Sequence, residues 1–302
     1  MSCNCGCHDD KPPATGWRRL VPLIVGAVVV GALIVGAVLK KEHSAGSSSG
    51  PSMPAAQERT ADRPAPTSVS MSGEAGRVQW IGEMHAAVHE GDTAAKVALP
   101  TLLRRPHLSA IGPVEGLRGE ITVIDGNASI GISDGKGGTA TSQRDVNAAF
   151  LVWANVDEWV RVPLPDRVRT EADIEAFIPE AARAGGLSVD EPLPFRIEGR
   201  SEAMALHVIW QEPGTPPGKE AHDKAKVPRT LADAEVSIVG FWSGAHRGVF
   251  TPAFSDIHMH VITKDGAVSG HVESVRLAAG ATLLLPAWAK TKAEPPPSAA
   301  GS

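Results

Sequence analysis

The feature that most constrains this chain is a short segment with three histidines around an Asp-Gly pair. Residues 255–275 read SDIHMHVITKDGAVSGHVESV and contain His258, His260 and His271. The residues on either side of Asp265-Gly266 are rich in strand formers. Gly and Asp tolerate the positive φ of a type I′ turn, which joins two antiparallel strands by two residues. The sequence therefore predicts a β-hairpin with its turn at Asp265-Gly266.

The register of that hairpin decides which side chains meet. Side chains two apart on a strand share a face, so His258 and His260 point the same way. A two-residue turn places His260 directly opposite His271, and His258 opposite Glu273. Directly opposed residues have Cβ atoms about 4.5–5.5 Å apart. Three imidazoles and one carboxylate are therefore expected to converge on one face.

Converging imidazoles point to a metal site. Neutral imidazole binds Zn²⁺ and similar divalent metals, and three protein ligands with one open position are typical of catalytic zinc. We predict that His258, His260 and His271 hold Zn²⁺ or another divalent transition metal. The alternative is three exposed histidines on a solvated strand face. A register slip of one residue would move every partner to the other face.

Bulk composition excludes little. The chain has 302 residues and a net charge of −5, which gives no electrostatic argument for a nucleic-acid partner. Its cysteines, Cys3, Cys5 and Cys7, all lie near the N-terminus, so we expect no disulfide in the rest of the chain. The cysteine cluster could bind a soft metal, be lipidated, or have no defined role.

A second segment predicts a membrane anchor. Residues 20–39 contain no charged side chain and have the length that crosses about 30 Å of hydrocarbon. Basic residues before the segment outnumber those just after it by one, which favours a cytoplasmic N-terminus and an extracytoplasmic C-terminal domain. The prediction is a single-pass membrane protein. A cleaved signal peptide is the alternative.

Composition divides the rest of the chain. Segments crowded with Ser, Gly, Pro and Ala bury too little apolar surface to fold. The predicted organisation is a cysteine-containing cytoplasmic tail (1–19), the membrane anchor (20–39), a disordered linker (40–77), a globular domain (78–288) and a disordered tail (289–302).

The globular domain is expected to be rich in strands. Residues 170–184 form the one convincing amphipathic helix, with Ile174, Phe177 and Ile178 on one face. Elsewhere strands predominate, and residues 212–228 read as a polar loop. The expected strands are 119–124, 128–132, 148–156, 194–197, 203–210, 236–241, 257–263, 272–277 and 281–285. The predicted class is α+β, with strand-dominated mixed or antiparallel sheets and a few helices.

Several stretches, in this order, resemble the alpha-acetolactate decarboxylase family. The resemblance covers about residues 78–285, and the H-x-H-x10-H hairpin is its most specific part. The matching stretches are IGEMHAAVHEGDTAAKVAL (81–99), GLRGEITVIDG (116–126), PFRIEG (194–199) and GFWSGAHRGVFTPAFSDIHMHVITKDGAVSGHV (240–272).

The resemblance implies an activity and its residues. Family members decarboxylate 2-acetolactate, a small hydroxy-keto acid, to acetoin and CO₂, and often form homodimers. The three histidines of the hairpin would hold the metal, usually zinc. Glu120 and Arg196 would also line the site as catalytic residues. A metal acts as a Lewis acid on the charge left by CO₂ loss, a guanidinium can orient the carboxylate, and an acid protonates carbon.

One departure from the family concerns a carboxylate. The family uses a further glutamate well beyond its third histidine, whereas this chain ends in a low-complexity tail in which Glu294 is a poor candidate. We hypothesise that Glu273 takes over as metal ligand or proton donor. The alternative function is a catalytically impaired module of the same fold that binds a metal or a small molecule.

Overall fold

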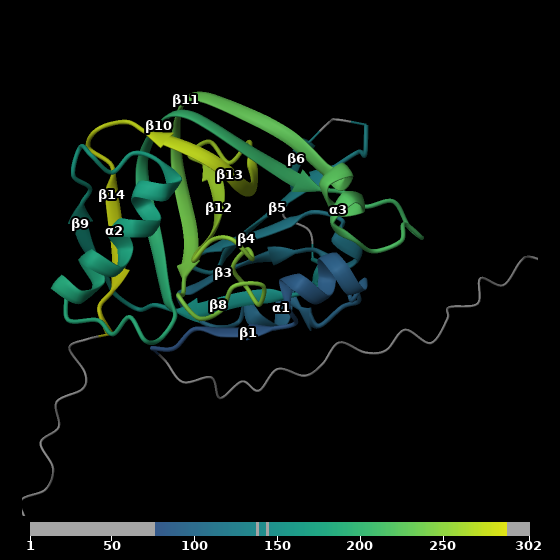
Figure 1. The fold of residues 1–302 in the computed structure, drawn as a ribbon, viewed down its shortest axis with the longest axis horizontal. Coiled ribbons are helices and arrows are strands. Elements are labelled where there is room, and N and C mark those ends of the chain that lie inside the picture. Colours follow the sequence, from purple (N-terminus) through teal and green to yellow (C-terminus); the bar gives the residue numbers. More distant parts are fainter. Residues whose placement is uncertain (1–75, 137–138, 143–144, 289–302) are drawn as a thin grey trace, which may run out of the picture. The chain divides into compact units, whose positions relative to one another are not determined.

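The computed structural model describes residues 76–136, 139–142 and 145–288, all of which lie in one compact unit, Thr60–Ser302 (Figure 1). The predicted tails 1–19 and 289–302, the segment 20–39 and the linker up to residue 75 lie outside the described residues, as do the three cysteines.

The predicted membrane localisation is corrected. Among the described residues, no helix has both the length and the apolar character needed to cross a membrane. The segment on which that prediction depended, residues 20–39, lies outside the described part of the chain.

Two antiparallel six-stranded sheets form the framework, which confirms the strand-dominated class. The first sheet has the order β1 (Gln79–Ile81), β8 (Leu151–Asn155), β3 (Leu108–Pro113), β4 (Glu120–Ile124), β5 (Asn127–Ser133) and β6 (Thr139–Ser142). The second has the order β11 (Lys226–Trp242), β12 (Ile257–Thr263), β13 (Ser269–Leu277), β10 (Leu193–Ile209), β14 (Thr282–Pro286) and β9 (Trp159–Pro163). A small separate ladder joins β2 (Val97–Ala98) to β7 (Asn147–Ala148).

The second sheet closes on itself. One edge of β10 pairs with β11, and its other edge pairs with β13 and β14. Since β12 lies between β11 and β13, strands β10 to β13 form a closed ring of hydrogen-bonded neighbours. The two long strands β10 and β11 extend together toward α3 (Figure 1). The ring brings residues from four strands to a common region.

Helices are short apart from one. The helical segments are η1 (a π-helix, Ala86–Glu90), α1 (Leu99–Leu102), η2 (a 3₁₀ helix, Glu115–Leu117), α2 (Glu171–Ala184) and α3 (Lys219–Ala225). Helix α2 begins with a capping box in which Thr170 and Asp173 satisfy each other's backbone N–H groups. Its buried residues, among them Ile174, Phe177 and Ile178, pack in the core of the second sheet. The predicted helix 170–184 is therefore confirmed.

The two sheets pack closely where β5 meets β13. A Cβ atom on Gly131 would lie 2.5 Å from the carbonyl oxygen of Ser269, so only glycine allows this approach. Elsewhere apolar side chains of both sheets, such as Ile111 and Val152 from one and Val239 and Phe241 from the other, share one buried cluster. This contact aligns β4 with the histidine hairpin.

Three local predictions are corrected. Residues 194–197 and 203–210 belong to one continuous strand, β10, which keeps its register with β11 through this stretch and has a bulge at Glu202 against β13. The polar loop 212–228 contains helix α3 and the start of β11. Strands β2, β3, β6 and β9 were not predicted.

Candidate metal centre

The hairpin has the predicted register but a different turn. His260 pairs with His271, as expected. The connection is a four-residue loop, because Thr263 and Val268 are joined by a hydrogen bond of 3.0 Å. Gly266 has a φ of 71°, whereas Asp265 is not among the residues with positive φ, so the turn is not type I′. Instead the Asp265 carboxylate accepts hydrogen bonds from the Thr263 hydroxyl (2.6 Å) and the Ala267 N–H (3.0 Å).

The three predicted histidines lie together. The ligand-type nitrogens of His258, His260 and His271 are all within 4.8 Å of one another. His258 Nε2 and His271 Nδ1 lie 3.1 Å apart. His258 and His260 are buried, and His271 is partly exposed. These residues could hold a metal ion.

Two of these rings are anchored through Nδ1, which leaves Nε2 for a ligand. His258 Nδ1 lies 2.8 Å from the carbonyl oxygen of Phe250. A carbonyl only accepts, so this nitrogen carries the proton and Nε2 keeps its lone pair. His260 Nδ1 lies 3.2 Å from the hydroxyl of Thr122, on β4. Metal-binding histidines usually have such an anchor on the other ring nitrogen.

Electrostatics keep these imidazoles neutral. Burial lowers the pKa of His258 to about 4, and it lowers the pKa of His260 and His271 well below the ordinary value. His260 Nε2 is buried and has no hydrogen-bond partner among the described residues. A buried polar nitrogen without a hydrogen-bond partner is costly. A divalent cation would satisfy this nitrogen, so the donor set fits a metal.

Glu120 is brought to the same place by β4. Its Oε2 lies 3.6 Å from His260 Nε2, and its Oε1 accepts a hydrogen bond of 3.3 Å from the Ile209 N–H. Burial raises the pKa of Glu120 to about 8. The carboxyl group therefore holds a proton at neutral pH when no cation is beside it.

A fourth histidine, His207, was missed by sequence reasoning. It pairs with His271 across β10 and β13, and the two ring centroids are 4.7 Å apart. His207 Nδ1 lies 2.7 Å from the Glu273 carboxylate, and Nε2 lies 3.6 Å from Glu120 Oε1. The side chain is buried, which lowers its pKa. The only signal in the sequence was a histidine in a predicted strand, because the pairing is with a distant strand.

Glu273 is close to the site but not where it was expected. The ladder between β12 and β13 ends at His260, so no pairing places Glu273 opposite His258. Its carboxylate instead contacts His207 and the Lys226 ammonium group, each at 2.7 Å. These two contacts lower the pKa of Glu273 to about 2. An ionised carboxylate of this kind is a poor proton donor. As the hypothesis allowed, it could instead be a metal ligand, because its oxygen and nitrogens of His207 and His271 lie within 4.8 Å of one another.

Arg196 is not brought to the histidines. Val239 on β11 pairs with Arg196 on one side and with His260 on the other, so a whole strand separates the two residues. The guanidinium group hydrogen-bonds to Glu198 (3.1 Å) and lies over the Trp159 ring, 5.6 Å from its centroid.

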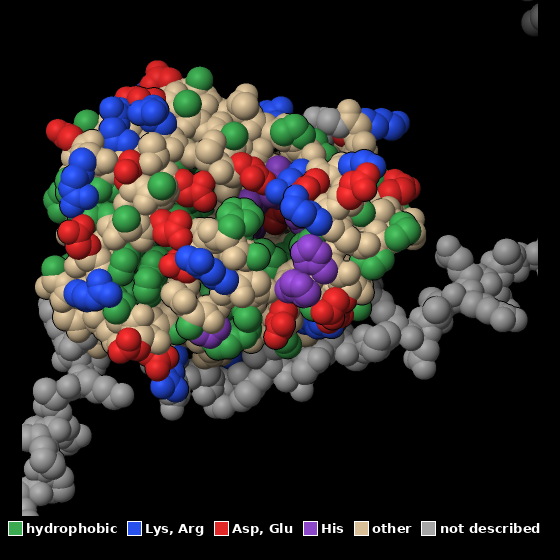
Figure 2. Space-filling view, viewed as in Figure 1, with side chains coloured by type: hydrophobic (Ala, Val, Ile, Leu, Met, Phe, Trp, Pro, Cys, Tyr) green, Lys and Arg blue, Asp and Glu red, His purple; other side chains and the backbone are tan. Residues whose placement is uncertain are grey.

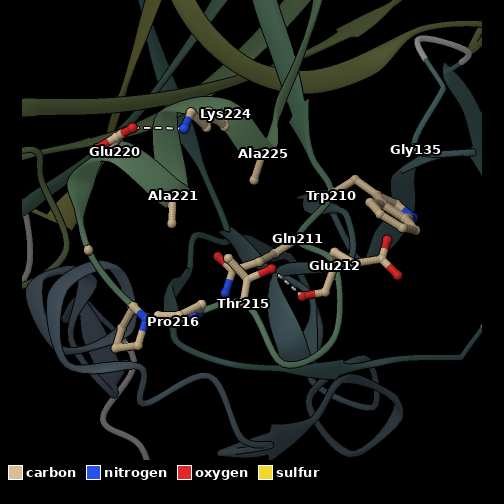
Figure 3. A pocket seen from close by; sticks show the side chains of 12 residues that line it. Gly135, Trp210, Gln211, Glu212, Thr215, Pro216, Glu220, Ala221, Lys224 and Ala225 are labelled. Atoms are coloured by element: carbon tan, nitrogen blue, oxygen red, sulfur yellow. Dashed lines mark hydrogen bonds and ion pairs between the residues drawn. The ribbon is translucent and has the colours of Figure 1, made fainter.

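Two hollows are visible near these strands. In the space-filling view, histidine and acidic side chains appear at the bottom of a hollow with basic side chains at its rim (Figure 2). A second hollow lies between α3, the 211–218 loop and Gly135, and Trp210, Thr215 and Glu220 are among its lining residues (Figure 3). None of the predicted site residues lines the second hollow.

Comparison with known proteins identifies relatives of this fold. A model of the alpha-acetolactate decarboxylase family matches residues 84–299. No curated protein sequence matches the chain at a significant level.

Solved structures show the same architecture. The chain is 18% identical to alpha-acetolactate decarboxylase from Bacillus subtilis strain 168, with a TM-score of 0.55 over 69% of this chain and 84% of that one. It is 19% identical to acetolactate decarboxylase from Bacillus subtilis subspecies spizizenii, with a TM-score of 0.56 over 70% and 85%. A Staphylococcus aureus protein of unknown function, described as similar to alpha-acetolactate decarboxylase, gives 16% identity and a TM-score of 0.53 over 69% and 84%. These likenesses establish the fold.

Proposed function

Because the chain belongs to the alpha-acetolactate decarboxylase family, we propose that it converts 2-acetolactate to acetoin and CO₂ at a divalent metal, zinc in the first instance. The observation that carries this proposal is the set of three neutral imidazoles, His258, His260 and His271, gathered beside a buried carboxyl group, Glu120.

The histidines supply the neutral nitrogen donors that zinc prefers. Zinc, when bound, acts as a Lewis acid toward the charge that remains on the substrate oxygens after CO₂ leaves. The Phe250 carbonyl and the Thr122 hydroxyl fix the orientation of His258 and His260 before any ligand arrives. Fixed donors reduce the reorganisation that the reaction requires.

Glu120 is the group best suited to move a proton. It is buried, and its carboxyl oxygens lie 3.6 Å from His260 Nε2 and 3.6 Å from His207 Nε2. Loss of CO₂ leaves the electron pair of the broken C–C bond on the substrate carbon that carried the carboxylate. Acetoin forms when a proton is delivered to that carbon, and we assign this step to the Glu120 carboxyl group.

This proposal gives two other predicted residues roles that differ from the predicted ones. Glu273 is a positioning residue, since its carboxylate orients His207 and its pKa is low. Arg196 is left out, because its guanidinium group is engaged by Glu198 and Trp159. Recognition of the substrate carboxylate therefore needs another cation.

The test is acetoin release from racemic 2-acetolactate by the purified full chain, with added Zn²⁺ and with a chelator. We expect zinc-dependent acetoin that is lost in His260→Ala and retained in the matched control His89→Ala, which changes an exposed histidine. Stoichiometric zinc without acetoin would instead favour a binding module of the same fold. A chain that binds no zinc would overturn the proposal.

A further inference from the structure

One lysine lies on the same face of the sheet as the histidines. Lys226 directly follows helix α3 and begins β11, where it pairs with Ile209 of β10. Directly paired residues share a face, and so do residues two apart on one strand. The side chains of Lys226, Ile209 and His207 therefore lie on one face, and His207 continues this face to His271 through their pairing.

Lys226 is linked to the metal centre through one carboxylate oxygen. Its Nζ lies 2.7 Å from Glu273 Oε1, and the same oxygen lies 2.7 Å from His207 Nδ1. The side chain of Lys226 is 28% exposed, whereas that of His207 is 6% exposed. Lys226 is therefore more exposed to solvent than His207, the imidazole that contacts the same oxygen. An ammonium group has three donors, so it can keep Glu273 and still bind a second anion.

The positive charge of Lys226 lies close to the site, because its Nζ and His207 Nδ1 contact the same Glu273 oxygen. The basic side chains at the rim of the hollow in Figure 2 agree with this positive charge.

Charge also favours an anionic substrate. The Lys226 ammonium group adds a positive charge near the histidines that would hold a divalent cation, and a carboxylate is attracted to both.

We propose that Lys226 recognises the carboxylate of the substrate, in the place where the family resemblance led us to expect Arg196. The ligand class is a small monoanionic acid that carries a neighbouring hydroxyl or keto oxygen for the metal. This inference rests on the proposed function and deepens it, by naming the residue that selects the anion.

The chemistry gives this role a kinetic signature. The carboxylate is charged in the bound substrate and becomes neutral CO₂ as the C–C bond breaks. An interaction with that charge therefore stabilises the bound substrate at least as much as the transition state. Lys226→Met should raise KM, with kcat unchanged or higher.

The decisive experiment measures binding without turnover. The zinc-loaded full chain is titrated in a calorimeter with 2,3-dihydroxy-2-methylbutanoate, a reduced analogue of 2-acetolactate that has no keto group and cannot lose CO₂ in the same way. Butane-2,3-diol, which is the same skeleton without the carboxylate, is the neutral reference. Lys224→Met is the matched control, because Lys224 is exposed, lies two residues earlier and pairs with Glu220.

We expect Lys226→Met to weaken binding of the acid by about ten- to a hundred-fold, since the free energy of a hydrogen bond to a charged group corresponds to about that factor in affinity. Binding of the diol should stay the same. Lys226→Arg should restore most of the affinity for the acid, and Lys224→Met should leave it near that of the wild type.

Three results would overturn the inference: equal weakening of the acid and the diol in Lys226→Met, equal loss of acid binding in Lys224→Met, or no loss in either variant. Failure of the proposed function looks different. A wild-type chain that binds the acid through Lys226 but releases no acetoin would contradict the decarboxylase proposal and support anion recognition.

Discussion

At the scale of single residues, two buried side chains of the site are in states that are unfavourable in the metal-free chain. His260 Nε2 is buried without a hydrogen-bond partner among the described residues, and Glu120 is buried with a proton that it would release in water. Both conditions are unfavourable without a cation. They are explained together if a divalent ion completes the site, because the ion accepts the lone pair and favours the ionised carboxyl group.

Glu120 makes the stability of the metal-free chain depend on pH. Its pKa is about 8 in the folded chain, against an ordinary value of 4.5, so between these pH values only the folded chain keeps the proton. The stabilisation is complete below about pH 4.5 and is lost as pH rises toward 8, by up to about 1.4 kcal/mol per pH unit. We expect Glu120→Gln to remove this slope.

The measurement is urea unfolding of the chelator-treated chain between about pH 7 and 8, where unfolded histidines, with a pKa near 6.5, are mostly neutral. Glu180→Gln, which removes an exposed carboxylate, is the control. Equal slopes for the wild type and Glu120→Gln would contradict this assignment.

At the scale of elements, strand β4 of the first sheet orients a ligand of the second. Thr122 on β4 contacts His260 Nδ1 at 3.2 Å and accepts a hydrogen bond of 3.1 Å from the Ser269 hydroxyl. The close approach at Gly131 holds the two sheets in this arrangement. The metal centre therefore depends on how the sheets pack, as well as on the hairpin.

This dependence predicts that Thr122→Val weakens metal binding. Valine keeps the shape and removes the hydroxyl that anchors His260, and loss of such an anchor typically reduces affinity about 10- to 100-fold. Zinc affinity is measured by competition with a chromogenic chelator. Thr141→Val is the control, since its hydroxyl bonds to the Ala267 carbonyl at an exposed position. An unchanged affinity in Thr122→Val would show that the anchor has no role.

At the scale of the whole molecule, the site joins elements that are far apart in the chain. The histidines come from β10, β12 and β13, and Glu120 comes from the other sheet. An ion that binds the folded chain but not the unfolded chain stabilises the folded state by mass action, and this effect does not depend on which contacts hold the ion. Zinc should therefore act as a link between the two sheets.

Zinc at about 100 times its dissociation constant should stabilise the chain by about 2.7 kcal/mol, and should raise Tm by roughly 5–10 °C for a domain of this size. Thermal unfolding with and without zinc measures the shift. In His260→Ala, the same concentration of zinc should give a much smaller shift. A shift of the same size in that variant would place the stabilising ion elsewhere.

Local sequence determined the parts of this protein whose partners are close in the chain. The pairing of His260 with His271 depends on one short loop, and it is correct even though the turn is not type I′. Helix α2 follows from its cap and its apolar face. In both cases the interacting residues lie within a few turns or one hairpin, where spacing alone fixes geometry.

Tertiary structure decided everything that depends on pairing between distant strands. His207 reaches His271 because β13 lies between β12 and β10, so that His271 pairs with His260 on one side and with His207 on the other. Glu273 lies at a bulge of the β10–β13 ladder, between the residues that pair with Ala205 and Leu206. Arg196 pairs with Val239, whose other partner is His260, and its guanidinium group contacts Glu198 and Trp159. Residue spacing fixes which side chains share a face, but the order of strands in a closed sheet depends on the packing of the whole core.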